Sequence, residues 1–126
     1  MKQHLILAAL DEATRYPDKP VHPASELRGE GDGEARTVAR NLMSDCHQDY
    51  LREPKVLPQM GQALRRWIDG GPTHLSDDYG HEYERGYLLV QQQILRILDG
   101  DYETITDLLD EARLRATFHC EEAING

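Results

Sequence analysis

The sequence of 126 residues has few cysteines and no long apolar run. Its two cysteines, Cys46 and Cys120, cannot build a disulfide framework, so we expect a reducing compartment. No apolar run approaches the roughly 20 residues that span a bilayer. The short apolar stretch at residues 5–10 is followed by Asp11 and Glu12 and by no cleavage site, which argues against a signal peptide. We therefore expect a cytoplasmic protein that makes no membrane contact.

Motifs that mark catalytic sites are also missing. The sequence contains neither G-x-S-x-G nor H-E-x-x-H, and no glycine-rich phosphate loop. Gly29, Gly31 and Gly33 lie among acidic residues and no GKS or GKT element follows them, so we interpret residues 17–34 as a flexible loop. The sequence therefore predicts a protein that is not an enzyme.

Spacings that mark metal sites are missing as well. Cys46–His47 and His119–Cys120 are pairs of adjacent residues, whose side chains point about 100° apart on a helix. Structural zinc sites favour spacings such as C-x2-C or H-x3-H instead. We therefore expect no metal and no cofactor.

Basic residues are scarce in the second half of the chain. Residues 1–70 carry ten Lys and Arg against eleven Asp and Glu, whereas residues 71–126 carry four against twelve. The net charges of the two parts are −1 and −8, and the whole chain carries −9. A uniformly basic nucleic-acid-binding protein is thereby excluded, and the second half would repel phosphate.

Apolar residues recur at helical spacing over three stretches of the first half. These stretches are residues 2–14, about 34–51 and about 59–68. Pro54 and Pro58 bracket the segment between the second and third stretches, which we interpret as extended. Gly70, Gly71 and Pro72 follow the third stretch and mark the best domain boundary in the chain.

The second half predicts two helices joined by a short connection. Ser76 is a good N-cap for the first helix, which should run to Leu98 and stop at residues 99–100. The second helix covers about residues 102–123. Because the connection between them is only DGD, we expect an antiparallel hairpin.

The first of these two helices carries a heptad seam over two repeats, with apolar and aromatic residues spaced by 4, 3, 4 and 3. The seam consists of Tyr83, Tyr87, Val90, Ile94 and Ile97. It packs either against a neighbouring helix of the same chain or against a second copy, which would give a homodimer. Tyrosines also favour interfaces, and Tyr79 is the best exposed candidate.

The first seventy residues follow the order helix, loop with a short helical turn, long helix, short extended hairpin, helix. The segments that carry this order are HLILAALDEA, HPASEL, EARTVARNLMSDCHQDYLRE and KVLPQMGQALRRWIDGG. The order resembles that of small bacterial winged-helix DNA-binding proteins, over residues 1–70. The resemblance implies that the long helix lies in the major groove and reads base edges from its outward face.

The resemblance also indicates which side chains would contact DNA. Arg36 and Arg40 are four residues apart and so project from the same side of the long helix. Arg, Asn and Gln can hydrogen-bond base edges, and basic residues near the wing can contact phosphates. The residues concerned are Arg36, Thr37, Arg40, Asn41, Gln48, Arg52 and Lys55.

We therefore expect a mainly α fold. A winged-helix-like module covers residues 1–70, and an acidic antiparallel two-helix hairpin covers residues 73–126. These two parts form either separate units or one shared core. The favoured function is a non-enzymatic interaction module: a small acidic inhibitor or adaptor, of the kind that mobile elements use against host defence, which binds a protein with a basic surface. Its charge would speed association with such a partner. The expected partner-binding residues are Tyr79, Glu82, Asp107, Asp110 and Glu111.

The alternative function is a winged-helix transcriptional regulator that binds duplex DNA and dimerises through its C-terminal helices. A specific DNA-binding protein needs several phosphate contacts. In the first half of this chain, the basic residues are offset by acidic ones. The charge distribution therefore favours a protein partner.

Overall fold

The computed structural model describes the backbone of residues 3–15, 26–71 and 80–125, and the side chains of residues 3–15, 29–71 and 82–114. The α-helices are α1 (Gln3–Ala13), α2 (Glu26–Cys46), α3 (Leu57–Gly70), α4 (Gly80–Leu98) and α5 (Tyr102–Asn125). Between α2 and α3 lie two short 3-10 helices, η1 (Tyr50–Arg52) and η2 (Pro54–Val56). The expectation of a mainly α-helical protein is confirmed, and none of the described helices is long and apolar enough to cross a membrane.

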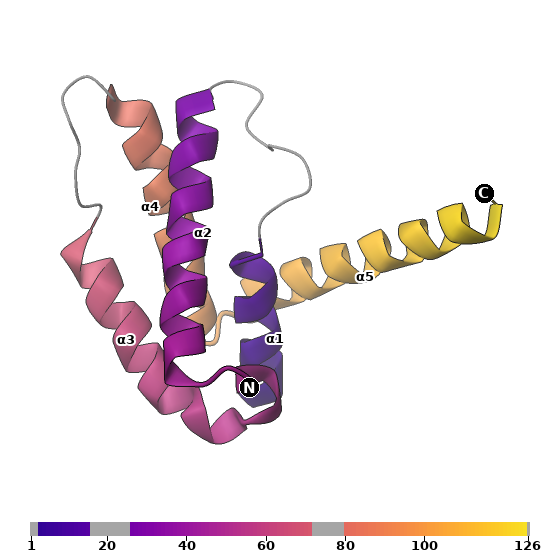
Figure 1. Cartoon of the computed structure of the whole chain (residues 1–126), viewed down its shortest axis with the longest axis horizontal. Coiled ribbons are helices and arrows are strands. Elements are labelled where there is room, and N and C mark those ends of the chain that lie inside the picture. Colours follow the sequence, from indigo (N-terminus) through magenta and orange to yellow (C-terminus); the bar gives the residue numbers. More distant parts are fainter. Residues whose placement is uncertain (1–2, 16–25, 72–79, 126) are drawn as a thin grey trace.

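One buried apolar cluster joins all five helices. It includes Leu7 on α1, Met43 on α2, Leu64 on α3, Ile94 on α4 and Ile105 on α5. The most extensive packing in the molecule is between α2 and α4, which lie side by side in Figure 1. Residues from both sides of the predicted boundary at Gly70–Pro72 therefore contribute to the same core.

The helix α2 begins at Glu26, and residues 26–34 are helical where the sequence predicted a flexible loop. The prediction is wrong there because a glycine makes the close approach of α2 to α4 possible. A Cβ atom on Gly31 would collide with the carbonyl oxygen of Tyr83 and lie 3.1 Å from the amide nitrogen of Tyr87. Glycine adds nothing to an apolar pattern, so periodicity does not reveal this contact. The rest of the predicted loop, up to residue 25, lies outside the described residues.

The segment between α2 and α3 is helical, so the prediction of an extended wing is wrong. The amide of Glu53 donates to the carbonyl of Tyr50 at 3.2 Å, and the amide of Val56 donates to the carbonyl of Glu53 at 3.0 Å. Pro54 occupies the start of η2, where its fixed φ suits a helix and its missing N–H has no consequence. The described residues of the first half thus contain no strand from which a wing could form.

The predicted end of α4 at Leu98 is confirmed, whereas α3 continues two residues past its predicted end, to Gly70. After α4, Gly100 adopts a φ of 78°, and its amide donates to the carbonyl of Ile97 at 3.0 Å. The amide of Asp101 donates to the carbonyl of Arg96 at 3.0 Å, which completes a Schellman motif. The predicted N-cap at Ser76 lies outside the described residues.

The last helix does not lie antiparallel along α4 as the short connection predicted. In Figure 1, α5 leaves the end of α4 at a wide angle, passes α1 and projects from the body of the molecule. Its first half is held by Ile105, which is buried, and by Leu108 and Leu109, which pack against the core. More of α5 lies against α1 than against α4.

Candidate functional site

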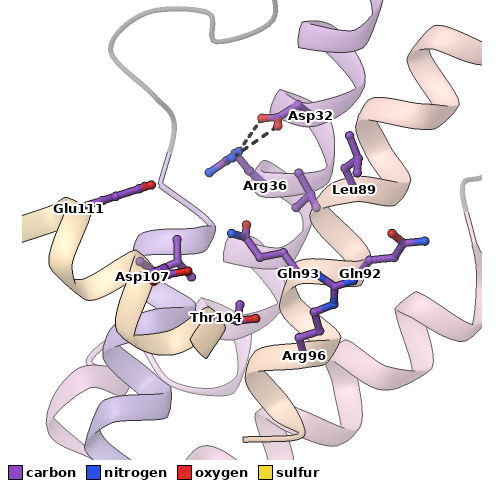
Figure 2. A pocket seen from close by; sticks show the side chains of 11 residues that line it. Asp32, Arg36, Leu89, Gln92, Gln93, Arg96, Thr104, Asp107 and Glu111 are labelled. Carbon is purple, nitrogen blue, oxygen red and sulfur yellow. Dashed lines mark hydrogen bonds and ion pairs between the residues drawn. The ribbon is translucent and has the colours of Figure 1, made fainter. Parts of the chain in front are cut away.

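The wide angle between α4 and α5 leaves a cleft of about 480 Å³, with α2 forming its third side (Figure 2). Its apolar lining comes from Leu89 and Val90 on α4 and from Leu108 on α5. The polar lining consists of Asp32, Arg36, Gln92, Gln93, Arg96, Thr104, Asp107 and Glu111. The cleft therefore combines apolar surface with charges of both signs.

The α5 side of the cleft is acidic. Asp107 and Glu111 are four residues apart and lie on the same face of the helix, as Figure 2 shows. Neither carboxylate makes an ion pair within the part of the chain that the structure describes. Two negative charges without an ion-pair partner among the described side chains therefore border the cleft.

The α4 side of the cleft contributes a cation and an exposed leucine. Arg96 stands at the opposite end of the cleft from Glu111 (Figure 2) and also makes no ion pair among the described side chains. Leu89 is 47% exposed. A second hollow of about 280 Å³ shares Leu89 with the cleft and continues along α4 past Leu88. A half-apolar groove thus follows the outer face of α4.

The structure separates the predicted partner-binding residues. Asp107 and Glu111 line the cleft, whereas Asp110 is exposed on α5 outside its lining. Glu82 lies near the start of α4, with its carboxylate 3.9 Å from the guanidinium of Arg85. Tyr79 lies outside the described residues.

The two arginines predicted to read bases face the interior of the molecule. Arg36 donates to Asp32 at 2.5 Å and to the carbonyl oxygen of Ala13 at 2.9 Å. Arg40 donates to the carboxylate of Asp11 at 2.6 Å. Both side chains therefore bind the C-terminal end of α1, where helix carbonyls need donors. The two side chains share one direction, as the sequence predicted, and that direction is towards the end of α1.

The other residues predicted to contact DNA are exposed but lie on several different elements. Thr37 donates its hydroxyl hydrogen to the carbonyl of Gly33 at 2.9 Å, as solvent-facing helical threonines often do. The remaining four are Asn41 on α2, Gln48 in the turn after it, Arg52 on η1 and Lys55 on η2. Without Arg36 and Arg40 they do not form the predicted reading face of a single helix.

The heptad seam packs inside the chain. Val90, Ile94 and Ile97 are buried in the core, together with Tyr87, and α2 is the main helix packed against α4. Tyr83 is half-buried, and its hydroxyl donates to the carboxylate of Glu34 on α2. The seam is therefore used within one chain, and its assignment to a dimer is corrected, because a buried side chain is not available to a second copy.

A buried polar network that sequence reasoning missed is centred on Asp11, which is only 6% exposed. Its carboxylate accepts hydrogen bonds from Arg40, from the hydroxyl of Tyr50 at 2.8 Å and from Arg15 at 3.2 Å. Burial and the neighbouring Asp11 carboxylate raise the pKa of Tyr50 to about 12. At neutral pH this phenol is protonated and acts as a donor that joins η1 to α1. No local signal marks the network, because an acid at a helix end is ordinarily solvated.

The predicted cysteine–histidine pairs do not form a cluster of metal ligands in the described part of the chain. The Nδ1 atom of His47 accepts a hydrogen bond from the amide of Asp49 at 2.9 Å, and the neighbouring Cys46 is half-buried. Among the side chains that the structure describes, no group of three or more His, Cys, Asp or Glu could hold a metal ion. The side chains of His119 and Cys120 lie outside the described set.

Comparison with known proteins yields no relative. No family model matches the chain, and neither a curated protein nor a solved structure matches it. The function therefore has to be inferred from the cleft and from the charges around it.

Proposed function

We propose that this protein is a non-enzymatic interaction module, an inhibitor or adaptor, that binds a basic surface of a partner protein through the cleft between α4 and α5. The observation that carries the proposal is the pair Asp107 and Glu111, whose carboxylates border the cleft and make no ion pair with any side chain that the structure describes. A partner's Lys or Arg side chains can neutralise these charges, and its apolar side chains can cover Leu89.

The charge of the whole chain supports the same kind of partner. Most of the net charge of −9 comes from residues 71–126, which include α4 and α5. A field of one sign attracts an oppositely charged partner over distances of about one Debye length and raises the association rate. The acidic half of the molecule therefore steers a basic protein towards the side on which the cleft lies.

A duplex DNA partner is disfavoured by the use that the fold makes of Arg36 and Arg40. A winged-helix regulator would present such side chains from its long helix to base edges. Here Arg36 is bound to Asp32 and to α1, and Arg40 is bound to Asp11. Freeing either guanidinium for DNA would remove a charge-assisted hydrogen bond from a buried carboxylate, which is costly.

The proposal is tested by affinity capture from a bacterial lysate, with the wild type beside two charge-reversal variants. The first variant, Asp107→Lys/Asp110→Lys/Glu111→Lys, reverses the acidic surface of α5. The matched control reverses three exposed acids on other elements, namely Asp45→Lys, Glu53→Lys and Asp69→Lys. The change in net charge is the same in both variants.

We expect the wild type and the control to retain one basic partner that dissociates at high salt, because rim charges are screened. The α5 variant should lose it. Capture of no partner, or of a partner that the α5 variant retains, would refute the proposal. Circular dichroism of all three proteins checks that each variant keeps its helices.

A further inference from the structure

We propose that the segment of the partner that occupies the cleft is a single amphipathic α-helix, with apolar residues along one face and two basic residues one turn apart beside it. This inference rests on the proposed function, because it specifies which structure of the partner protein the acidic cleft recognises. It is carried by the backbone of the cleft, its apolar lining and the spacing of its charges.

The backbone of the cleft selects a helix over an extended peptide. Every lining residue comes from α2, α4 or α5, whose backbone groups are already bonded within their own helices. An extended segment would find no strand edge in the described parts of the chain to complete its backbone hydrogen bonds. A helix satisfies its own backbone and needs only side-chain contacts, which is the helix-in-groove mode of recognition.

The apolar lining fits the apolar face of such a helix. Leu89 is 47% exposed, and the half-buried Leu108 lies in the same cleft, whereas Val90 is 2% exposed and offers almost no free surface. The smaller hollow next to Leu88 extends this surface along α4. A docked helix would therefore place successive apolar residues, at the i, i+3 and i+4 positions, along α4 and remove these leucines from water.

The spacing of the acidic residues matches one turn of the docked helix. Asp107 and Glu111 are four residues apart, which corresponds to a rise of about 6 Å. Two Lys or Arg residues at i and i+4 of the partner have the same separation, so each can face one carboxylate. A second copy of α5 does not fit this site, because it would bring its own acidic residues against Asp107 and Glu111.

Arg96 indicates the direction in which the docked helix runs. Its guanidinium lies at the opposite end of the cleft from Glu111 (Figure 2) and has no ion-pair partner among the described residues. The C-terminal end of a helix carries partial negative charge. The docked helix should therefore run with its basic residues near Asp107 and Glu111 and with its C-terminal end, or an acidic residue there, near Arg96.

The test uses a synthetic peptide of about 15 residues, long enough to form a helix in the bound state. Its leucines follow the i, i+3, i+4 pattern, with two lysines at i and i+4 and a glutamate in the last turn. One control peptide has the same composition in an order without helical periodicity. A second control carries a central proline, which breaks the helix. Binding is measured by fluorescence anisotropy at low ionic strength.

We expect the amphipathic peptide to bind the wild-type protein at least about tenfold more tightly than either control peptide, a difference of roughly 1.4 kcal/mol. Asp107→Lys/Glu111→Lys should weaken its binding by a similar factor. Asp45→Lys/Asp69→Lys changes the net charge equally at exposed positions outside the lining, and should leave the affinity within about threefold. Leu89→Asp should also weaken binding, although it adds a negative charge.

Two results would overturn the inference. The first leaves the proposed function intact, whereas the second would also move the proposed binding surface away from the cleft. Equal binding of the amphipathic and proline-containing peptides would show that basic charge is recognised without a helix. Equal loss in the two charge-reversal variants would place the peptide on the acidic surface in general and not in the cleft. Failure of the proposed function is distinct, since the protein would then capture no basic partner and bind none of the three peptides.

Discussion

Arg40 on α2 donates a hydrogen bond of 2.6 Å to the carboxylate of Asp11 on α1, joining residues that are 29 positions apart in the sequence. The carboxylate is buried, and the guanidinium is its strongest neutralising neighbour by distance. A side chain that looked suited to reading DNA thus stabilises the contact between two helices. This pair and three other features of the core lead to predictions about stability, and the charge distribution leads to one about DNA.

Replacing Arg40 by alanine should destabilise the protein. The carboxylate of Asp11 would remain buried with one charge-assisted hydrogen bond fewer, which costs about 3 kcal/mol. The matched control is Arg52→Ala, because Arg52 is 85% exposed and lies 4.0 Å from its nearest carboxylate. That control should change the free energy of unfolding by less than about 0.5 kcal/mol. Urea denaturation followed by circular dichroism compares the two, and equal stability of both variants would contradict a structural role for Arg40.

Two glycines of α2 should respond in opposite directions to alanine. A Cβ on Gly31 would collide with the backbone of α4 at Tyr83, so Gly31→Ala should cost about 1–3 kcal/mol as the helices separate. Gly29 has no atom within 4 Å of the corresponding position, so Gly29→Ala should stabilise the helix by about 0.5–1 kcal/mol. Chemical denaturation measures both, and a stabilising Gly31→Ala would mean that α2 and α4 do not cross closely at this position.

The stability of the protein should fall at alkaline pH, partly because of Tyr50. Its pKa is about 12 in the folded protein, against an ordinary value of 10 in the unfolded chain. Between these values the unfolded state binds fewer protons than the folded state, so the free energy of unfolding decreases as the pH rises. Below pH 10 the hydroxyl is protonated in both states and its contribution is constant.

The variant Tyr50→Phe should therefore show a smaller alkaline loss of stability than the wild type. Part of the loss should remain, because burial also raises the pKa of Tyr87. Tyr102→Phe, at a position that is 69% exposed, is the matched control and should keep the wild-type dependence. The test measures the urea denaturation midpoint of each protein across the alkaline pH range. If the midpoint falls with pH equally in the wild type and in Tyr50→Phe, ionisation of Tyr50 is not coupled to unfolding.

Gln91 on α4 offers a way to stabilise the protein. Its side chain is 1% exposed, and neither atom of its amide has a hydrogen-bond partner within the described structure. Methionine has a similar length and no polar group to satisfy, so Gln91→Met should raise the free energy of unfolding by about 1–3 kcal/mol. Gln92→Met changes the exposed neighbour and should have an effect below about 0.5 kcal/mol. A destabilising Gln91→Met would show that the amide is satisfied in solution.

The protein should not bind random-sequence duplex DNA in a salt-sensitive manner. Phosphate contacts are strongest at low ionic strength, so anisotropy of a labelled duplex at about 50 mM salt is the most permissive assay. The net charge of −9 and the inward-facing Arg36 and Arg40 predict no measurable binding. Binding that disappears in Arg36→Ala/Arg40→Ala, with the fold intact, would favour the transcriptional regulator over the protein-binding module.

The elements that sequence patterns predicted well are those with local determinants. The apolar spacing of Leu5–Leu10 identified α1, and Gly100 ends α4 with a backbone conformation that glycine adopts easily. The heptad spacing identified the inner face of α4, although it could not distinguish a partner helix in the same chain from one in a second copy. The sequence also predicted the acidic charge of α5, because the charge of a side chain does not depend on where the fold places it.

The features that the sequence could not reveal depend on which distant residues meet. Gly31 belongs to a helix because its missing side chain lets α2 approach Tyr83 of α4, and Arg36 faces inward because Asp32 and the end of α1 surround it. The cleft lies where α5, which contributes Ile105 to the shared core, diverges from α4.

The sequence by itself therefore determined a mainly helical chain, most of its helix ends and its acidic second half. These properties follow from the spacing, conformational preference and charge of neighbouring residues. Only the tertiary structure decided that Arg36 and Arg40 bind the end of α1 and that two acids of α5 border an open cleft. Such pairings arise from burial and from hydrogen bonds between residues far apart in the chain, such as Asp11 and Arg40, and these depend on how the helices pack.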